Sequence, residues 1–500
     1  MLTALQKHIC VDKAEFILLE IQRIGELLNG GGNRLQDVFG DGPPAVLELL
    51  AKIKHEETQR EYTCGQKAFQ KFPELVSLTL EGRLDVHDFD QKEVSERLRS
   101  TFLSFVFKNR EVIVADFIEQ WLDEAVIYVS RRHRSFTHYL PCVALQIGDN
   151  NSYRFGAVEF SRKSQVRAEA VDALRKYESA RDRLSNRARR NAAPGLQWCW
   201  DRAAEHPPKE PAAAFDKLTE GVEWVAKITV PRCASSVSGG RAEAALRLAL
   251  CGMTLLLPGG EGAGLRLKDD PSVPFQVNKL SSVGSGAKFR PSSSWKFGAP
   301  KVDQGWREHI ESNAPEVLAV VEHLIQQTLN GNALAFGFQI ALRAITWYAD
   351  AVRESNAETS LIKCTTAIEC LLLPPKRQAT AAFVIRGSLL AQRIGFPMSH
   401  WAPIARRLYE RRGDVVHGNI DSLQTASQES LSEAMGFTRN VMLQFLVFCR
   451  QLQPLGLKRA GTREDVLDLY REIEGSFHDE IEITTKQYGF AWNVVPSTTP

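Results

Sequence analysis

Arg412 and His417 are the side chains whose types and spacing best fit chemistry on a phosphate group. They lie five residues apart in LYERRGDVVHGN, residues 408–419, a stretch with the pattern of a helix end. A guanidinium binds phosphate oxygens through paired hydrogen bonds, and an imidazole, with a pKa near 6.5, exchanges a proton close to neutral pH. No Cys, Ser or metal-ligand cluster accompanies them. The competing interpretation is a charged helix end, where the helix dipole alone favours a His.

The spacing sets a condition on the structure. Five residues at about 100° each leave two side chains about 140° apart on an ideal helix, so they do not share a face. The two groups converge if the helix ends or bends before His417, which Gly413 and Gly418 would allow. Alternatively, a second subunit supplies the missing partner.

Three further residues are candidates for supporting roles. Arg412 leans toward the packed side of its helix and needs an anion there, and Glu369, a lone acid in an apolar helix, is one candidate. The alternative is that Glu369 pairs with Arg386. Asp414 lies three residues before the His and can orient the imidazole, and Arg411 permits a spacing of six residues to the same His.

Composition limits the class of protein. The chain has 500 residues, an apolar fraction of 44% and a net charge of +2, which fit a globular protein of several domains rather than a strongly basic nucleic-acid-binding chain. The nine cysteines are scattered and form no C-x-x-C pair, as expected for reduced thiols in the cytoplasm. No signal peptide is evident, and no apolar run approaches the ~20 residues of a membrane-spanning helix, so we expect a cytoplasmic protein that does not enter a membrane.

Hydrophobic periodicity predicts a fold that is mainly α, with an α+β middle region. Residues 1–135 are predicted to be a helical N-terminal region of unknown role, with helical patterns over 14–28, 43–57, 93–107 and 112–129. Residues 136–310 form the middle domain. There a hairpin is expected over 141–160, around an Asp-Asn-Asn turn, followed later by a strand at 224–233 and a buried helix at 240–257.

Two segments of the middle domain are candidates for binding phosphate. A helix predicted over 165–190 ends in RDRLSNRARR, where Arg183, Arg187, Arg189 and Arg190 could contact RNA, although a solvated helix face is the alternative. The glycine-rich GGEGAGLRLK and SSVGSGAKF do not complete the G-x-x-x-x-G-K-[ST] phosphate loop, and we interpret both as ordinary loops.

Residues 311–455 are predicted to form an antiparallel helical bundle. Six helical patterns follow one another with short connections, over 315–329, 335–355, 358–373, 380–395, 403–416 and 431–452. In the second, Ile340, Ala344, Trp347 and Ala351 are expected on one face. Gly418 stands where a glycine caps a helix C-terminus. Residues 456–500 are a tail with one predicted helix, REDVLDLYREIE, and an end that could pack back as a strand.

The bundle resembles a known family. The Trp-Tyr-Ala of the second helix, AIECLL of the third, FVIRGSLL of the fourth, LYERRGDVVHG and the long closing helix follow in the order found in the Apea-like branch of the HEPN superfamily. The resemblance covers roughly residues 315–453 and implies a metal-independent ribonuclease that works as a homodimer, with the Arg and His sets of two subunits meeting in one groove. Arg412 and His417 match the motif, Glu369 matches a family glutamate, and Gly413 departs from the polar residue usual after the Arg.

The resulting interpretation is an endoribonuclease that uses neither metal nor cofactor. The resemblance implies RNA as substrate and a role in phage defence or a toxin-like stress response, and the first 300 residues would then sense a phage or stress trigger or select the RNA. The alternative is a non-catalytic module for nucleic-acid or nucleotide binding and dimerisation. A metal nuclease or phosphoryl transferase is disfavoured, because the sequence has no ligand cluster and no complete phosphate loop.

Overall fold

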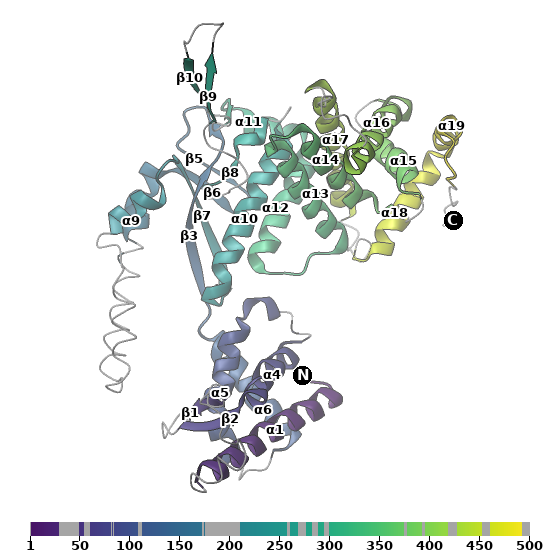
Figure 1. Cartoon of the computed structure of the whole chain (residues 1–500). Coiled ribbons are helices and arrows are strands. Elements are labelled where there is room, and N and C mark those ends of the chain that lie inside the picture. The colour runs from purple at the N-terminus through teal and green to yellow at the C-terminus, as the bar shows by residue number, and fades with distance from the viewer. Residues whose placement is uncertain are drawn as a thin grey trace. The chain divides into compact units, whose positions relative to one another are not determined.

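The computed structural model is mostly helical, with a small antiparallel sheet in the middle of the chain (Figure 1). The structure describes residues 2–29, 50–54, 61–81, 83, 85–108, 113–172, 175, 211–257, 261–268, 277–282, 289–294, 300–374, 378–392, 396–418, 428–452 and 461–492. It divides into two compact units. The smaller comprises residues 1–136, 230–241 and 330–332, and the larger comprises 137–229, 242–329 and 333–500. The smaller unit also takes in short segments from the predicted middle domain and bundle. The predicted division into four domains stays a prediction.

The smaller unit is helical around one short sheet. Its elements are α1 (Ala4–Asn29), β1 (Leu50–Lys54), β2 (Glu61–Gly65), α3 (Gln66–Phe69), α4 (Lys71–Leu80), the 3-10 helix η2 (Val86–Asp88), α5 (Gln91–Lys108) and α6 (Ala115–Ser130). Aromatic rings fill its core: Phe72 meets Phe102 edge to face, and Phe105 stacks on Trp121. The indole of Trp121 donates a hydrogen bond to Thr101, so this large side chain is buried with its polar group satisfied.

The helical prediction for residues 43–57 is wrong at its described part. LAKIK forms strand β1, which pairs antiparallel with β2. Ile53 is buried, and Lys52 forms an ion pair with Glu61 of the partner strand at 2.8 Å. The apolar spacing of this stretch fits a helix locally. The strand with which it pairs, β2, begins beyond residue 57, so the pairing that makes it a strand is not visible in the stretch itself.

The larger unit contains a five-stranded sheet in the order β5-β6-β7-β3-β8. Its strands are β3 (Arg134–Val143), β5 (Ser152–Phe155), β6 (Val158–Arg162), β7 (Trp224–Cys233) and β8 (Arg266–Leu267). Strands β4 (Gln146–Ile147), β9 (Val277–Ser282), β10 (Phe289–Ser294) and β11 (Lys301–Val302) form separate pairs. The strand predicted at 224–233 is confirmed as β7.

The predicted hairpin is displaced along the chain. The Asp-Asn-Asn turn connects β4 to β5, but β4 pairs in parallel with β11, whereas β5 pairs with β6. The hairpin turn is at Gly156, which has a φ of +57° that glycine adopts without steric cost. The Asp-Asn-Asn signal therefore marks a turn between two sheets.

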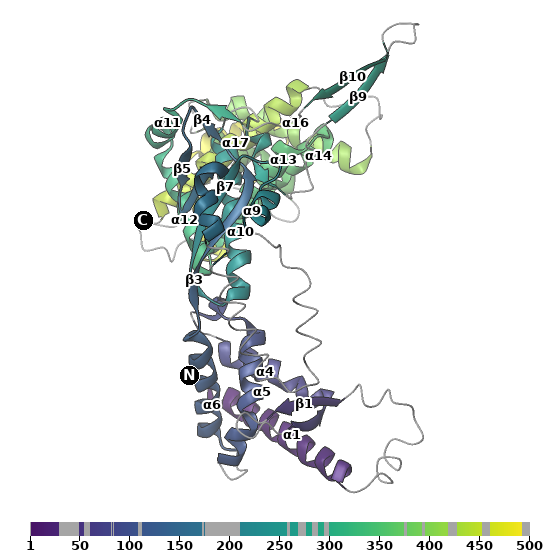
Figure 2. The same cartoon turned by 90° about the vertical axis from the view of Figure 1, so that its left-hand side faces the viewer.

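Helix α10 (Ser235–Leu256) lies beside the sheet in both cartoon views (Figures 1 and 2), which confirms the buried helix predicted there. Gly252 allows the close packing. A Cβ at this position would lie 2.5 Å from a methyl carbon of Val321 in helix α12 (Pro315–Asn330) and 3.4 Å from the ring of Phe155 in the sheet. Helix α10 therefore packs between the sheet and α12.

All six predicted bundle helices are present. They are α12 (Pro315–Asn330), α13 (Phe336–Arg353), α14 (Ala357–Leu372), α15 (Ala379–Gln392), α16 (Met398–His417) and α17 (Gln428–Leu452); short helices α9 (Pro211–Leu218), η4 (Glu261–Gly264) and α11 (Trp306–Asn313) precede them. Each matches its predicted range to within a few residues at either end. HEPN-type topology stays a prediction.

The described part of the tail contains two helices where one was predicted, and the end of the chain that could pack back as a strand lies largely outside the described residues. REDVLDLYREIE lies in α18 (Arg463–Ser476), as predicted, and α19 (His478–Tyr488) follows. Both pack on the bundle: Ile481 belongs to a core cluster with Ile385, and the Tyr470 hydroxyl donates to the carbonyl of Leu371. The tail is therefore part of the bundle's core.

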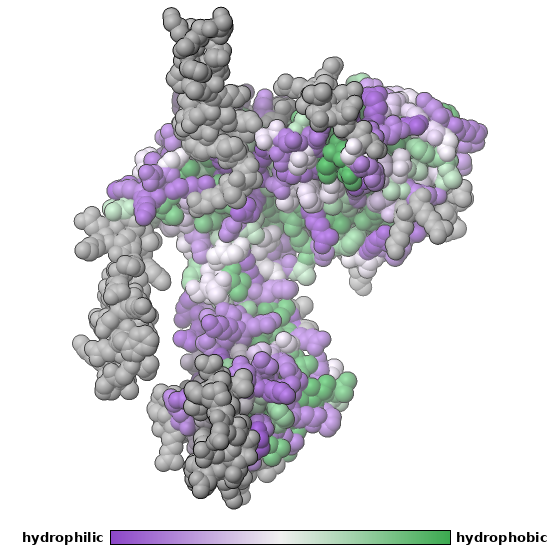
Figure 3. Space-filling view, in the orientation of Figure 1, coloured by the Kyte–Doolittle hydropathy of each residue, from purple (hydrophilic) through white to green (hydrophobic). Residues whose placement is uncertain are grey.

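Hydrophilic and hydrophobic residues are interspersed over the described surface seen in Figure 3. Among the helices that the structure describes, none combines the length and the apolar composition needed to cross a lipid bilayer.

Candidate functional site

Helix α16 carries the Arg and His motif and ends at the predicted glycine. Gly418 has φ 69° and ψ 22°, and its N–H donates to carbonyls of the last turn, so it forms a left-handed C-cap. The helix is continuous through Gly413 to His417. The positions of Arg412 and His417 therefore follow ideal helical geometry.

The structure does not bring Arg412 and His417 together within one chain. On a continuous helix the two side chains point about 140° apart and are offset by about 7.5 Å along the axis. The expected bend or early end of the helix is absent in α16, because Gly413 adopts ordinary helical geometry. His417 is exposed at the end of the helix. Of the two routes to convergence that the spacing allowed, only a second subunit remains.

Arg412 lies in a cluster with Glu369 of α14 and with Tyr409, one turn earlier on α16. Its Nη2 is 3.8 Å from Oε2 of Glu369, and its guanidinium carbon is 5.9 Å from the centre of the Tyr409 ring. The side chains of Arg412 and Glu369 are 29% and 24% exposed, so the pair is partly open to solvent. The predicted pairing of Glu369 with Arg412 is therefore present as an ion pair.

The ion pair is loose. A distance of 3.8 Å exceeds the 2.7–2.9 Å of a charge-assisted hydrogen bond. Arg412 Nε is buried and has no hydrogen-bond partner within the described part of the chain. A guanidinium placed in this way has donor capacity that an incoming anion could use.

Tyr409 is a site residue that sequence reasoning missed. Burial, the negative charge of Glu369 and a hydrogen bond with that carboxylate raise the pKa of the Tyr409 phenol, while the charge of Arg412 opposes the shift. The phenol is therefore protonated at neutral pH and lies beside the carboxylate that pairs with Arg412. Its position three residues before Arg412 was the available signal, since such residues are neighbours on a helix surface.

The alternative partner proposed for Glu369 is excluded by the structure. Arg386 instead forms a buried ion pair with Glu474 of α18, with Nε 2.7 Å from Oε1. Its Nη1 also donates to the carbonyl of Leu372, at the end of α14. Arg386 thus ties the tail to the bundle and contributes nothing to the Arg412 cluster.

The remaining predicted residues are not gathered at this cluster. Asp414 is exposed, and among the described residues it has no hydrogen bond or ion pair with His417. Arg411 lines a separate cavity of about 320 Å³ with Arg407 and with Glu433 of α17. Arg183, Arg187, Arg189 and Arg190 lie outside the residues that the structure describes.

The cluster has the donors for an anion but not the ligands for a metal. No group of three or more His, Cys, Asp or Glu side chains that could hold a metal ion occurs in the described ranges. All eight described cysteines are free thiols, seven of them buried, as expected for reduced cysteines that pack as small apolar residues. The chemistry available at the motif is that of a guanidinium, a carboxylate, a phenol and a nearby imidazole.

Gly413 offers a test of the continuous helix. A Cβ there would meet nothing within 4 Å, so Gly413→Ala should gain helix propensity without a clash. We expect the free energy of unfolding to rise by about 0.5–1 kcal/mol, measured by urea denaturation of the full chain against Gly418→Ala. The latter should be destabilising, because Gly418 has a φ of +69°. An unchanged or lower stability of Gly413→Ala would mean that residue 413 is not helical in solution.

Comparisons with protein-family models, curated proteins and solved structures return no match for this chain. Within the described structure, the Arg412–Glu369–Tyr409 cluster, near the helix end that also presents His417, is the candidate site with the clearest chemical content.

Proposed function

We propose that the chain is a metal-independent endoribonuclease that acts as a homodimer through its C-terminal bundle. The observation that carries the proposal is the state of Arg412: a partly exposed guanidinium, held loosely by Glu369 at 3.8 Å, with Nε buried and unpartnered among the described residues. In the proposed site, Arg412 binds the scissile phosphate, and His417 accepts or donates a proton as the general base or general acid.

The chemistry follows from the substrate. RNA places a 2′-hydroxyl beside each phosphodiester, so cleavage needs proton transfer and charge stabilisation at phosphorus but no external nucleophile. An imidazole takes or gives a proton near neutral pH, and a guanidinium stabilises the charge that grows on the phosphate oxygens. The products would be a 2′,3′-cyclic phosphate and a 5′-hydroxyl. Glu369 and Tyr409 would position the guanidinium.

The geometry of α16 supports a dimeric site over a monomeric one. His417 is exposed at the helix end and points away from the Arg412 cluster of its own chain. A two-fold axis near this helix end would bring His417 of each protomer toward Arg412 of its partner, because such an axis makes each contact twice. Each dimer would then hold two identical sites.

The biological setting is part of the same proposal. Resemblance to HEPN ribonucleases suggests phage defence or a toxin-like stress response. The activity of such an RNase must be regulated in the cell, and residues 1–300 are the part of the chain available to sense a phage or stress trigger. Growth arrest on overexpression, relieved by His417→Ala, is the corresponding cellular observation.

The separation of Arg412 and His417 also favours a second candidate function. If no partner completes the site, the Arg412 cluster can bind an anion but cannot transfer a proton to it. The bundle would then be a non-catalytic module for nucleic-acid or nucleotide binding and dimerisation. Intact RNA together with tight RNA binding is the result that this alternative predicts.

Purified full-length chain incubated with cellular RNA in EDTA tests the proposal. We expect cleavage to survive chelation, and Arg412→Ala and His417→Ala each to slow it by about 10²–10³-fold, the range for loss of one charge-stabilising or proton-transferring group. Arg406→Ala is the matched control. Arg406 is on the same helix, pairs with Glu410 at 2.6 Å and is not part of the cluster, so this variant should cleave at the wild-type rate.

Two results would contradict the proposal. Cleavage abolished by EDTA and restored by Mg²⁺ would indicate a metal nuclease. Cleavage unaffected by either motif substitution would place the activity elsewhere or assign it to a contaminant.

A further inference from the structure

We propose that Arg343 and Trp347 of α13 bind an unpaired nucleotide of the RNA strand close to the scissile phosphate. Arg343 would contact a neighbouring phosphate, and Trp347 would stack on a base. The inference rests on the proposed function, because it takes Arg412 as the group that binds the scissile phosphate. It extends the site across α14 to a surface that lies outside the Arg and His motif.

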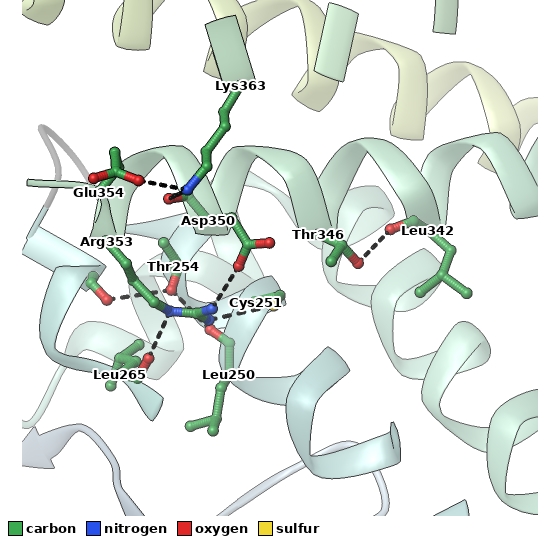
Figure 4. A network of polar contacts seen from close by, with 11 residues as sticks. Leu250, Cys251, Thr254, Leu265, Leu342, Thr346, Asp350, Arg353, Glu354 and Lys363 are labelled. Atoms are coloured by element: carbon green, nitrogen blue, oxygen red, sulfur yellow. Dashed lines mark hydrogen bonds and ion pairs between the residues drawn. The ribbon is translucent and has the colours of Figure 1, made fainter. Parts of the chain in front are cut away.

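The antiparallel packing of α13 and α14 places Arg343 level with the Glu369 end of α14. Near the other end of this helix pair, Nζ of Lys363 in α14 lies 3.5 Å from the carbonyl oxygen of Asp350 in α13 (Figure 4). Because the two helices run in opposite directions, a step back along α13 corresponds to a step forward along α14. Moving by the same number of residues in this way leads from Asp350 to Arg343 and from Lys363 to Cys370, the residue after Glu369.

The guanidinium of Arg343 is close to Cys370 and has no partner of its own. Burial raises the pKa of the Cys370 thiol, and the positive charge of Arg343 opposes that rise, as expected for a guanidinium near the sulfur. Arg343 is exposed, and in the part of the chain that the structure describes it forms no hydrogen bond or ion pair. Its N–H donors are therefore available to phosphate oxygens.

Trp347 presents an aromatic ring beside this arginine. It lies four residues after Arg343, so the two side chains are neighbours on the surface of α13. Trp347 is 39% exposed, and its ring stacks on no other aromatic ring among the described residues. Proteins that bind single strands combine cationic groups along the backbone with aromatic rings on which bases stack. A base in a duplex does not offer its face in this way, so the nucleotide bound here must be unpaired.

The position of this pair relative to Arg412 fits one continuous strand of RNA. Helix α14 packs against both α13 and α16, and packed helices lie about 8–10 Å apart. Helices α13 and α16 are therefore within about 20 Å of each other, a span of several nucleotides at about 3.4 Å per stacked nucleotide. Helix α14 reaches the surface at Thr366, Glu369 and Cys370, which are partly exposed. A strand bound at Arg412 can therefore continue over α14 to α13.

RNA binding by a chain that cannot cleave tests the inference. Each substitution is combined with His417→Ala in the full chain, and binding of a labelled single-stranded oligoribonucleotide is measured by fluorescence anisotropy at several salt concentrations. We expect Trp347→Ala to weaken binding at least about 5-fold, because a stacked base is lost, without changing the dependence on salt. Trp347→Phe keeps an aromatic ring and should retain most of the affinity. Arg343→Ala should lower the slope of log K against log salt by about 0.7, the value for one phosphate contact on a single strand.

Arg463→Ala and Ile483→Ala are the matched controls. Arg463 is an exposed arginine of α18 that likewise has no hydrogen bond or ion pair in the described structure, and Ile483 is an exposed apolar residue of α19. Neither substitution should change the affinity or the salt slope. With His417 intact, Arg343→Ala and Trp347→Ala should raise KM while kcat stays within about 2-fold of wild type, because the contacts are present in both the ground state and the transition state. Arg412→Ala should instead lower kcat.

Three results would overturn the inference: no RNA binding by the His417→Ala chain, an affinity of Trp347→Ala equal to that of Ile483→Ala, or a salt slope of Arg343→Ala equal to that of Arg463→Ala. Failure of this inference and failure of the proposed nuclease are distinguishable. RNA cleavage by the wild-type chain with unchanged binding in both α13 variants would reject the α13 surface and keep the nuclease. Absent cleavage with the expected losses of binding would reject the nuclease and keep the RNA-binding surface.

Discussion

Mixing Arg412→Ala chains with His417→Ala chains is expected to restore the RNA cleavage that each variant lacks alone. If Arg412 of one protomer works with His417 of its partner, a mixed dimer has one site with both substitutions and one site with neither. Random pairing makes half of the dimers mixed, each with one of two sites intact, so activity should recover to about a quarter of wild type in a C2 dimer. The measurement is cleavage of a labelled RNA after co-expression of differently tagged chains, and the mixed dimer isolated through both tags should have about half the wild-type activity.

The control is a mixture of Arg412→Ala chains with chains carrying both substitutions. No pairing of these chains contains an intact Arg412, so no activity should return. A mixed dimer that is isolated, confirmed by its mass, and inactive would contradict a site shared between protomers. The recovery expected is large, from about 10²–10³-fold below wild type to within a few-fold of it, and a small contamination with wild-type chain would not produce it.

Helices were predictable from this sequence because their signal is local. The bundle helices repeat apolar residues at the helical period over 14 residues or more, and Gly418 marks the end of α16 by its residue type alone. In α13, the sequence predicts Trp347 on one face with Ile340, Ala344 and Ala351, and those three are buried. The structure buries Tyr348, which is 1% exposed, and leaves Trp347 39% exposed. A residue one step along differs by only about 100° in direction, and α13 packs against both α14 and α17, so the face is decided by the neighbouring helices.

Features that depend on distant partners could not be predicted in the same way. Strand β1 exists because β2 pairs with it, and the hairpin is at Gly156 because β4 pairs with β11. The candidate site likewise combines a feature that is local in the sequence with one that depends on tertiary packing. The types of Arg412 and His417 are read directly from the sequence, but the contact of Arg412 with Glu369 requires α14 and α16 to pack together.

The buried pair between Arg386 and Glu474 leads to the largest stability effect that we expect. The two side chains are 6% and 4% exposed and 2.7 Å apart, and the Arg386 guanidinium also stacks at 4.7 Å over the Tyr470 ring. Glu474→Ala leaves that guanidinium buried without its counter-ion. The free energy of unfolding should fall by about 3–5 kcal/mol, as for other buried pairs that lose one partner, measured by urea denaturation followed through tryptophan fluorescence.

Replacing both members of the pair distinguishes two contributions to the free energy of unfolding: the cost of a buried charge without a counter-ion, and the net stabilisation from the ion pair. Arg386→Met with Glu474→Leu removes both charges and keeps apolar volume, so the double variant should be more stable than Glu474→Ala. Glu482→Gln, in an exposed i,i+4 pair with Lys486 on α19, is the matched control and should change stability by less than about 1 kcal/mol. If Glu474→Ala behaves like Glu482→Gln, α18 is not docked on the bundle in solution. A large loss in Glu474→Ala alone would instead show that the last two helices belong to the folded core that holds α14, and with it Glu369, in place.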